Sequence, residues 1–189
     1  MNNKKTPKNY VNNKDFYDAI VEYRKKIAEA EAENKVPPRM PEFIGECIYK
    51  IATRLAMKPC FTGYSYKEEM ISDAIENCIL YFKYFDPGKT QNPFAYFTQV
   101  IYFSFLRRLE KEKKNRYITY KYFQETMTLA YGSNLLVDSE DNPLISSAMY
   151  DNITTFMNSF EQAESKKKEK RKQKQTGITK FFSEDDKNE

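Results

Sequence analysis

The residues with the clearest chemical potential lie between positions 92 and 116, where aromatic, amide and basic side chains recur at helical spacing. At about 100° per residue, one side of a helix carries Tyr96, Gln99, Phe103 and Arg107. Aromatic rings stack on unpaired bases because every base offers a π-face, and an arginine can hold the neighbouring phosphate. This spacing therefore predicts a surface that binds single-stranded nucleic acid. The alternative left open by the sequence is that Tyr96 and Phe103 pack beneath the C-terminal helices.

The same helix continues into a run of basic side chains. Lysine and arginine neutralise phosphate charge, so this run extends the predicted nucleic-acid surface. Its members are Arg108, Lys111, Lys113, Lys114 and Arg116. The formal net charge is only +4, so the clustering of the basic residues supports this interpretation more than their total does.

A neighbouring amphipathic helix is predicted over residues 66–85. Its apolar side gathers Ile71, Ala74, Ile75, Cys78, Phe82 and Phe85. The opposite side carries Glu69, Asp73, Glu76 and the apolar Leu80. Taken alone, such an acidic face is a solvated surface.

The composition predicts an all-α fold. Only 5 of 189 residues are Gly and 8 are Pro, and long stretches are rich in Lys, Glu, Ala, Ile and Tyr, which suit helices. The chain is long enough for one sizeable core. We expect a disordered arm over 1–13, a compact helical domain over 14–131, a loop and C-terminal helix over 132–165, and a flexible tail with a basic linker over 166–189.

Breaks and caps place the helices within this domain. Asn13 or Asp15 is expected to cap a first helix that reaches about residue 34, and a second should span 41–57. Asp86-Pro87-Gly88 is a turn signal, and Asn92-Pro93 is a favourable start for a helix to about residue 115. Further helices are expected over 117–131 and 145–164. In the second helix the expected core positions are Phe43, Cys47 or Ile48, Ile51 and Leu55, and in the fourth Phe94, Phe97, Ile101, Phe105 and Leu109.

Several function classes are disfavoured by what the sequence lacks. It contains no His and only three Cys, without a CxxC pair, which excludes His-based catalysis and disfavours a zinc site. We expect no metal, no cofactor and no enzymatic activity. A nuclease that holds Mg²⁺ on Asp138, Glu140 and Asp141 is the weakest alternative, because these acids lie in a predicted loop. No apolar run approaches the roughly 20 residues that span a bilayer, so we expect no membrane partner and a place in the cytoplasm.

Three motifs in order resemble conserved region two of bacterial sigma factors. They are Glu69-Met70-Ile71-Ser72-Asp73-Ala74, Tyr84-Phe85-Asp86-Pro87 and Phe94-Ala95-Tyr96-Phe97-Thr98. Within that group, the chain looks like the late-transcription sigma factors of T-even-type tailed phages, through Tyr10-Val11-Asn12-Asn13-Lys14, Glu68-Glu69-Met70-Ile71, Asn92-Pro93, Ala95-Tyr96 and Thr98-Gln99. The resemblance covers roughly residues 10–125, which is more specific than any single motif. Gln99-Val100 stands where the family has a tryptophan pair.

The resemblance implies roles for both helices. The acidic helix would grip the coiled coil of the polymerase clamp domain, with its carboxylates meeting arginines. The implied polymerase-binding residues are Glu69, Ser72, Asp73, Glu76, Ile79 and Leu80. Tyr96 falls where the family's aromatic stacks on a flipped adenine of the melted −10 element.

The C-terminal segment carries a separate motif. Gln175, Ile178, Phe181 and Phe182 form the pattern Q-x-x-I-x-x-F-F, which resembles the PCNA-interacting peptide of sliding-clamp ligands. On one short helical turn, the apolar side chains would fill a pocket while the glutamine hydrogen-bonds beside it. The alternative is that the two phenylalanines fold back onto the domain. Residues 166–174 are expected to be a solvated linker that can also track DNA.

Together these features predict a phage late-gene sigma factor that binds core RNA polymerase and melts a −10-type, TATA-like promoter element. Residues 132–189 are too short and charged for the helix-turn-helix that reads the −35 element, so help is expected from the sliding clamp and from a separate coactivator on the polymerase flap. When free, the protein should be a monomer. The alternative is a clamp-tethered repair or replication adaptor that binds single-stranded DNA.

Overall fold

Every element in the described part of the chain is helical, which confirms the all-α fold that the composition predicts. The computed structural model describes residues 11–131 and 147–185, with side chains for 11–129 and 149–173. The chain divides into two compact units, of which the first ends at Glu110 and the second begins at Lys111.

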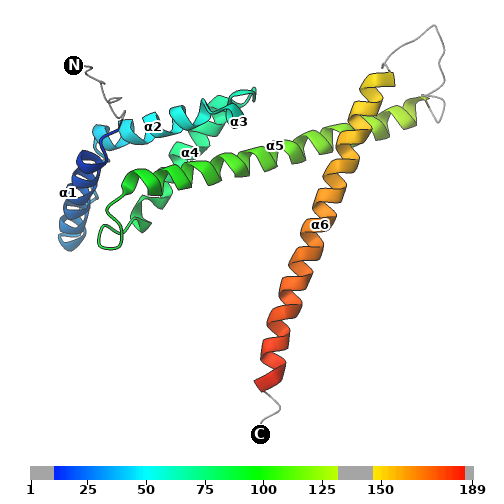
Figure 1. Cartoon of the computed structure of the whole chain (residues 1–189). Helices are drawn as coiled ribbons and strands as arrows, with labels where there is room; N and C mark the ends of the chain where they lie inside the picture. The colour runs from blue at the N-terminus through cyan, green and yellow to red at the C-terminus, as the bar shows by residue number, and fades with distance from the viewer. Residues whose placement is uncertain (1–10, 132–146, 186–189) are drawn as a thin grey trace, which may run out of the picture. The chain divides into compact units, whose positions relative to one another are not determined.

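The first unit is built from four longer helices and two short connecting elements. In chain order these are α1 (Asn13–Ala32), α2 (Glu42–Ala56), α3 (Pro59–Thr62), α4 (Lys67–Tyr81), the 3₁₀ turn η1 (Phe82–Tyr84) and the first part of α5 (Pro93–Tyr131). Figure 1 shows α2 and α4 beside the first part of α5, and side chains from all four longer helices meet in one core.

Buried side chains recur every three or four positions on each helix, because that spacing places them on one face. The core residues include Phe16, Ile20 and Tyr23 of α1, Ile44, Cys47, Ile48, Ile51 and Leu55 of α2, Met70, Ile71, Ala74 and Cys78 of α4, and Phe97, Ile101 and Phe105 of α5. Tilted and stacked rings fill the centre, where the Phe97 centroid lies 5.6 Å from that of Phe16 and 6.1 Å from that of Phe82. The spacing rule thus identified most of the core.

Two assignments near helix starts were wrong. Phe43 is 45% exposed and Ile44 is fully buried, because the core face of α2 lies one position later than the pattern suggested. Val11, expected in a disordered arm, is only 7% exposed and belongs to the core cluster.

Polar side chains fix where the helices begin. Asn12, rather than Asn13 or Asp15, caps α1, since its Oδ1 accepts from the Lys14 amide at 3.1 Å. Asn92 caps α5 as predicted: its Oδ1 accepts from the Ala95 amide at 3.0 Å, and Pro93 occupies the first helical position.

Asn13 instead joins α1 to the entrance of α5. Its Nδ2 donates to the Gln91 carbonyl at 3.3 Å, and its Oδ1 accepts from the Phe94 amide at 3.1 Å. The turn before this entrance is confirmed at Asp86, whose Oδ1 accepts from the Gly88 amide at 2.9 Å.

α5 is longer than the sequence suggested. We expected separate helices over 92–115 and 117–131, but one helix runs from Pro93 to Tyr131. Its second half contains neither Gly nor Pro, so no residue of these two types interrupts the backbone hydrogen bonds of the helix. The helix expected over 145–164 is likewise part of the longer α6 (Ser147–Asp185), which includes the basic segment expected to be a linker.

In the second unit, aromatic contacts pack the last part of α5 against α6. The rings of Tyr117 and Phe160 stack with centroids 4.7 Å apart, and Tyr120 meets Phe156 edge-on at 5.6 Å. The Tyr117 hydroxyl donates to Glu161 Oε1 at 2.7 Å, and this bond raises the pKa of Tyr117. These contacts show how the described side chains of 117–129 and 149–165 pack, which the sequence left open.

The three cysteines differ sharply in accessibility, which gives a first test of the core. Cys60 is exposed, whereas Cys47 and Cys78 are buried, and burial raises both thiol pKa values, that of Cys78 from 9.0 to about 12. Because the thiolate is the reactive form, we expect a thiol reagent at pH 8 to label one cysteine per folded chain and all three after denaturation. Rapid labelling of a second thiol in the folded chain would contradict this packing.

The raised pKa of Cys78 also makes the stability of the fold depend on pH. The folded-state pKa of Cys78 lies above its ordinary value, so its contribution to the free energy of unfolding is fully present below pH 9.0 and is lost as the pH rises towards 12.

Candidate nucleic-acid interface

The first part of α5 presents aromatic and polar side chains on the side opposite its core face. Phe103 is 49% exposed, and Gln99 and Arg107 are also exposed, as the helical spacing predicts. Phe94 and Leu109, at the two ends of the expected core stripe, are only partly buried. An exposed phenylalanine between an amide and a guanidinium is suited to stacking on a flat partner.

Tyr96 lies closer to the core than expected. Its ring centroid is 5.2 Å from those of Phe85 and Phe97, and its hydroxyl donates to the Tyr81 carbonyl at 2.9 Å. Burial raises the pKa of this phenol. The residue is therefore held rigidly, and only part of its ring is available to a ligand.

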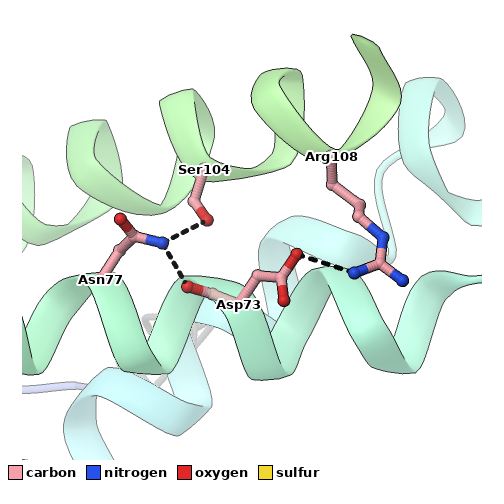
Figure 2. A network of polar contacts seen from close by, with 4 residues as sticks. All are labelled: Asp73, Asn77, Ser104 and Arg108. Atoms are coloured by element: carbon pink, nitrogen blue, oxygen red, sulfur yellow. Dashed lines mark hydrogen bonds and ion pairs between the residues drawn. The ribbon is translucent and has the colours of Figure 1, made fainter. Parts of the chain in front are cut away.

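A polar network joins α4 to α5 (Figure 2). Asn77 Nδ2 donates to the Asp73 carbonyl at 2.6 Å and to Ser104 Oγ at 3.2 Å, and Arg108 Nη1 pairs with Asp73 Oδ2 at 3.1 Å. Ser104 is 2% exposed, so its hydroxyl requires such a partner. The network fixes the register between the two helices.

Two of the predicted site residues thus contact each other. Asp73 was assigned to the polymerase and Arg108 to DNA, but the side chain of Arg108 is only 16% exposed and its guanidinium faces α4. A long side chain at position 108 can reach back across the helix, whereas Arg107, one position earlier, remains exposed. We therefore treat Asp73 and Arg108 as residues that hold the two helices together.

The ion pair has a measurable energetic consequence. We expect Arg108→Ala and Asp73→Ala each to lower the free energy of unfolding by about 1 to 3 kcal/mol, because each leaves a partly buried charge without this partner. A double-mutant cycle followed by urea unfolding should give a coupling of about 1 kcal/mol. Additive effects, with coupling below about 0.3 kcal/mol, would show that the pair contributes nothing.

Asn77 is a functional candidate that the sequence analysis missed. Its Oδ1 accepts from Arg107 Nη2 at 2.8 Å, while its amide group is fixed by Asp73 and Ser104. An asparagine in a helix interior indicates only a position where a polar partner is needed. Its partners on α5 lie 27 and 30 positions away, so no local pattern could identify them.

The outward face of α4 carries the remaining residues predicted to bind the polymerase. Ile79 and Leu80 are 55% and 59% exposed. Glu69, Ser72 and Glu76 are also exposed. Carboxylates beside exposed aliphatic side chains form a surface suited to a protein partner with basic groups.

The predicted basic extension lies in the second unit. Lys111, Lys113, Lys114 and Arg116 are exposed on α5, and the Arg116 guanidinium lies over the Phe156 ring at 5.6 Å from its centroid. These residues follow the exposed face of the first part of α5 in sequence. Their role as phosphate contacts stays a prediction.

The C-terminal motif and the acidic loop are not tested by side-chain geometry. The backbone of α6 continues helically to Asp185, while the side chains of Gln175, Ile178, Phe181 and Phe182 lie outside the described residues. The acidic residues Asp138, Glu140 and Asp141 also lie outside them. Among the residues whose side chains are described, 11–129 and 149–173, no group of three potential ligands is arranged to hold a metal ion.

Comparison with known proteins adds no family assignment. The chain matches no protein-family model and no curated protein. In the part of the chain that the structure describes, no helix has both the length and the apolar character needed to cross a membrane.

Proposed function

We propose that the chain is a sigma-type transcription initiation factor, which joins core RNA polymerase and captures an opened promoter strand. One observation carries this proposal: adjacent helices present opposite chemistry, an acidic and aliphatic face on α4 and an aromatic face with a guanidinium on α5. A factor that must hold a basic protein surface and a DNA strand at the same time needs both. The motif resemblance over residues 10–125 supports the same function.

The polymerase-binding surface comprises Glu69, Ser72, Glu76, Ile79 and Leu80. Exposed carboxylates attract a basic partner and orient it, while the aliphatic pair at the end of α4 supplies apolar area for the contact. The partner expected from the resemblance is the coiled coil of the polymerase clamp domain.

The DNA-binding surface comprises Gln99, Phe103, Arg107 and the accessible part of Tyr96. Removing a base from the duplex costs a few kcal/mol, and one stack on an aromatic ring returns about 1 to 3 kcal/mol. Because the core anchors α5 and Asn77 holds Arg107, the helix and this guanidinium are positioned before a strand binds. The predicted target is a −10-type, TATA-like late promoter element.

The proposed clamp-binding segment is assigned from sequence alone. Gln175, Ile178 and the Phe181-Phe182 pair would dock on a sliding clamp, and the lysines and arginine of residues 166–174 would lie near the DNA that threads it. Clamp tethering then raises the local concentration of the factor at promoters.

Gel filtration of the full chain with bacterial core RNA polymerase tests the proposal directly. Co-elution is expected, followed by run-off transcription from a TATA-like −10 template that increases when a sliding clamp is loaded. Failure to bind the core enzyme would sink the proposal, whatever the chain does with DNA.

The clamp-tethered repair or replication adaptor remains the second candidate because the C-terminal motif fits it equally well. Such an adaptor has no need for the acidic and aliphatic face of α4. Binding to single-stranded DNA and clamp without binding to polymerase would favour it.

A further inference from the structure

A hollow of about 430 Å³ lies beside the exposed face of α5. Its lining comes from the end of α4 and from about three turns of α5: Tyr81, Val100, Phe103, Leu106, Arg107 and Glu110. Pockets for small-molecule ligands typically measure about 300 to 1,000 Å³ and have apolar walls with a few oriented polar groups. The hollow fits this description.

Its aromatic walls are accessible rather than structural. Tyr81 and Phe103 are 42% and 49% exposed, in contrast to the fully buried Phe97 and Phe105 on the core side of α5. The two exposed rings border one hollow, and apolar hollows of this kind are typical of ligand or partner sites. Aromatic walls favour a flat partner with a π-face.

The cation at the hollow is oriented in advance. Arg107 Nη2 donates to Asn77 Oδ1 at 2.8 Å, and Asn77 is fixed in turn by the Asp73 carbonyl and Ser104 Oγ. One bond uses one of five guanidinium N–H donors, so others can reach an anion. An arginine that is already positioned loses less conformational freedom when it binds phosphate.

A ligand with a flat apolar face next to a negative group satisfies both features, and a nucleotide has this chemistry. We propose that the hollow receives one unpaired base of the DNA strand, with the base against Phe103 and its phosphate on Arg107. The inference rests on the proposed function and adds a base site separate from Tyr96, which lies two helical turns, or about 10.5 Å, away along α5. Asn77 is the positioning residue of this site.

Val100→Trp tests the hollow, because Val100 lines it and is only partly buried, so an indole at this position is expected to fill its space. Val36→Trp is the matched control, since Val36 is 90% exposed in the connection between α1 and α2. Binding of a labelled single-stranded −10-type oligonucleotide is measured for the full chain, with and without core RNA polymerase. We expect Val100→Trp and Phe103→Ala to weaken binding by about 5- to 150-fold, the range for one lost stack, and Val36→Trp to have no effect.

Abasic substitution identifies the bound base. One abasic site is moved along the oligonucleotide, and each abasic oligonucleotide is compared with the intact one. At one position the abasic site should weaken binding to the wild type but should not weaken binding to Val100→Trp, because the filled hollow already excludes that base. If every abasic position weakens the variant as much as the wild type, no base occupies the hollow. Loss of polymerase co-elution without loss of oligonucleotide binding would instead assign the hollow to a protein group and overturn the proposal.

Salt dependence tests the phosphate contact. The slope of log affinity against log salt is negative, and its magnitude should fall by about 0.7 in Arg107→Ala, as for one lost phosphate contact on a single strand. Asn77→Ala should shift the slope in the same direction. Unchanged slopes in both variants would remove Arg107 from the site.

Competition by deoxynucleoside monophosphates distinguishes a DNA strand from a free nucleotide as the ligand. We expect the monophosphates to displace the labelled oligonucleotide only at concentrations far above that of the oligonucleotide. If a free nucleotide binds more tightly than the oligonucleotide, the assignment to a strand is overturned.

These results separate the inference from the function on which it rests. A chain that binds polymerase and opens promoters but shows no special abasic position lacks the base site and keeps the proposed function. A chain that never binds polymerase loses the proposed function, and the oligonucleotide measurements without polymerase still decide the base site.

Discussion

Glu69→Lys combined with Glu76→Lys is expected to abolish co-elution with core RNA polymerase. Both side chains are exposed on α4, and their reversal places two cations where a basic partner surface should dock. Like-charge contacts of this kind cost several kcal/mol, and each 1.4 kcal/mol corresponds to tenfold in affinity. The loss should therefore exceed about 100-fold, measured by titration of labelled factor into core enzyme.

A matched control comes from α1, where Glu29→Lys with Glu31→Lys makes the same change of charge on exposed positions. That variant should bind polymerase like the wild type. Glu69 also lies in the first turn of α4, so its reversal should lower the free energy of unfolding slightly, by about 0.3 to 1 kcal/mol, and a thermal melt must show both variants folded. Equal binding by the two folded variants would contradict the assignment of the acidic face.

Phe97→Ala is expected to cause the largest loss of stability of any single substitution proposed for this chain. The Phe97 ring is fully buried and meets the rings of Phe16, Phe82, Phe85 and Tyr96. Removing it deletes buried apolar area and leaves a cavity, which together cost about 3 to 5 kcal/mol. A domain with a total stability of about 5 to 15 kcal/mol would be left marginal.

Urea unfolding measures this loss, and Phe103→Ala on the opposite side of α5 is the internal control. Phe103 is half exposed, so its truncation should lower the free energy of unfolding by less than about 1 kcal/mol. Similar losses in the two variants would mean that the face of α5 assigned to DNA also stabilises the fold.

Local rules predicted the parts of the structure that depend on local geometry. The cap by Asn92, the start at Pro93 and the burial of Phe97, Ile101 and Phe105 all follow from capping and helical spacing. The same rules misplaced Phe43 because a wheel fixes the width of an apolar face better than its centre when neighbouring positions are also apolar.

The candidate site was predicted only where it consists of one helix. Spacing placed Phe103 and Arg107 on one exposed face, yet the partners of Arg108 and Arg107 are residues of α4, brought near by tertiary packing. The partial burial of Tyr96 has the same origin, since Phe85 and Tyr81 arrive from a separate part of the chain. The hollow itself needs Tyr81 beside α5 and has no signature in either helix alone.

The hydrogen bonds of Asn13 affect the order in which the molecule can form. This side chain contacts Gln91 and Phe94, which lie 78 and 81 positions later, so the entrance of α5 is completed by residues synthesised long before it. Contacts between such distant positions require closure of a long loop, which slows folding. We therefore expect the entrance of α5 to gain these two hydrogen bonds late in folding.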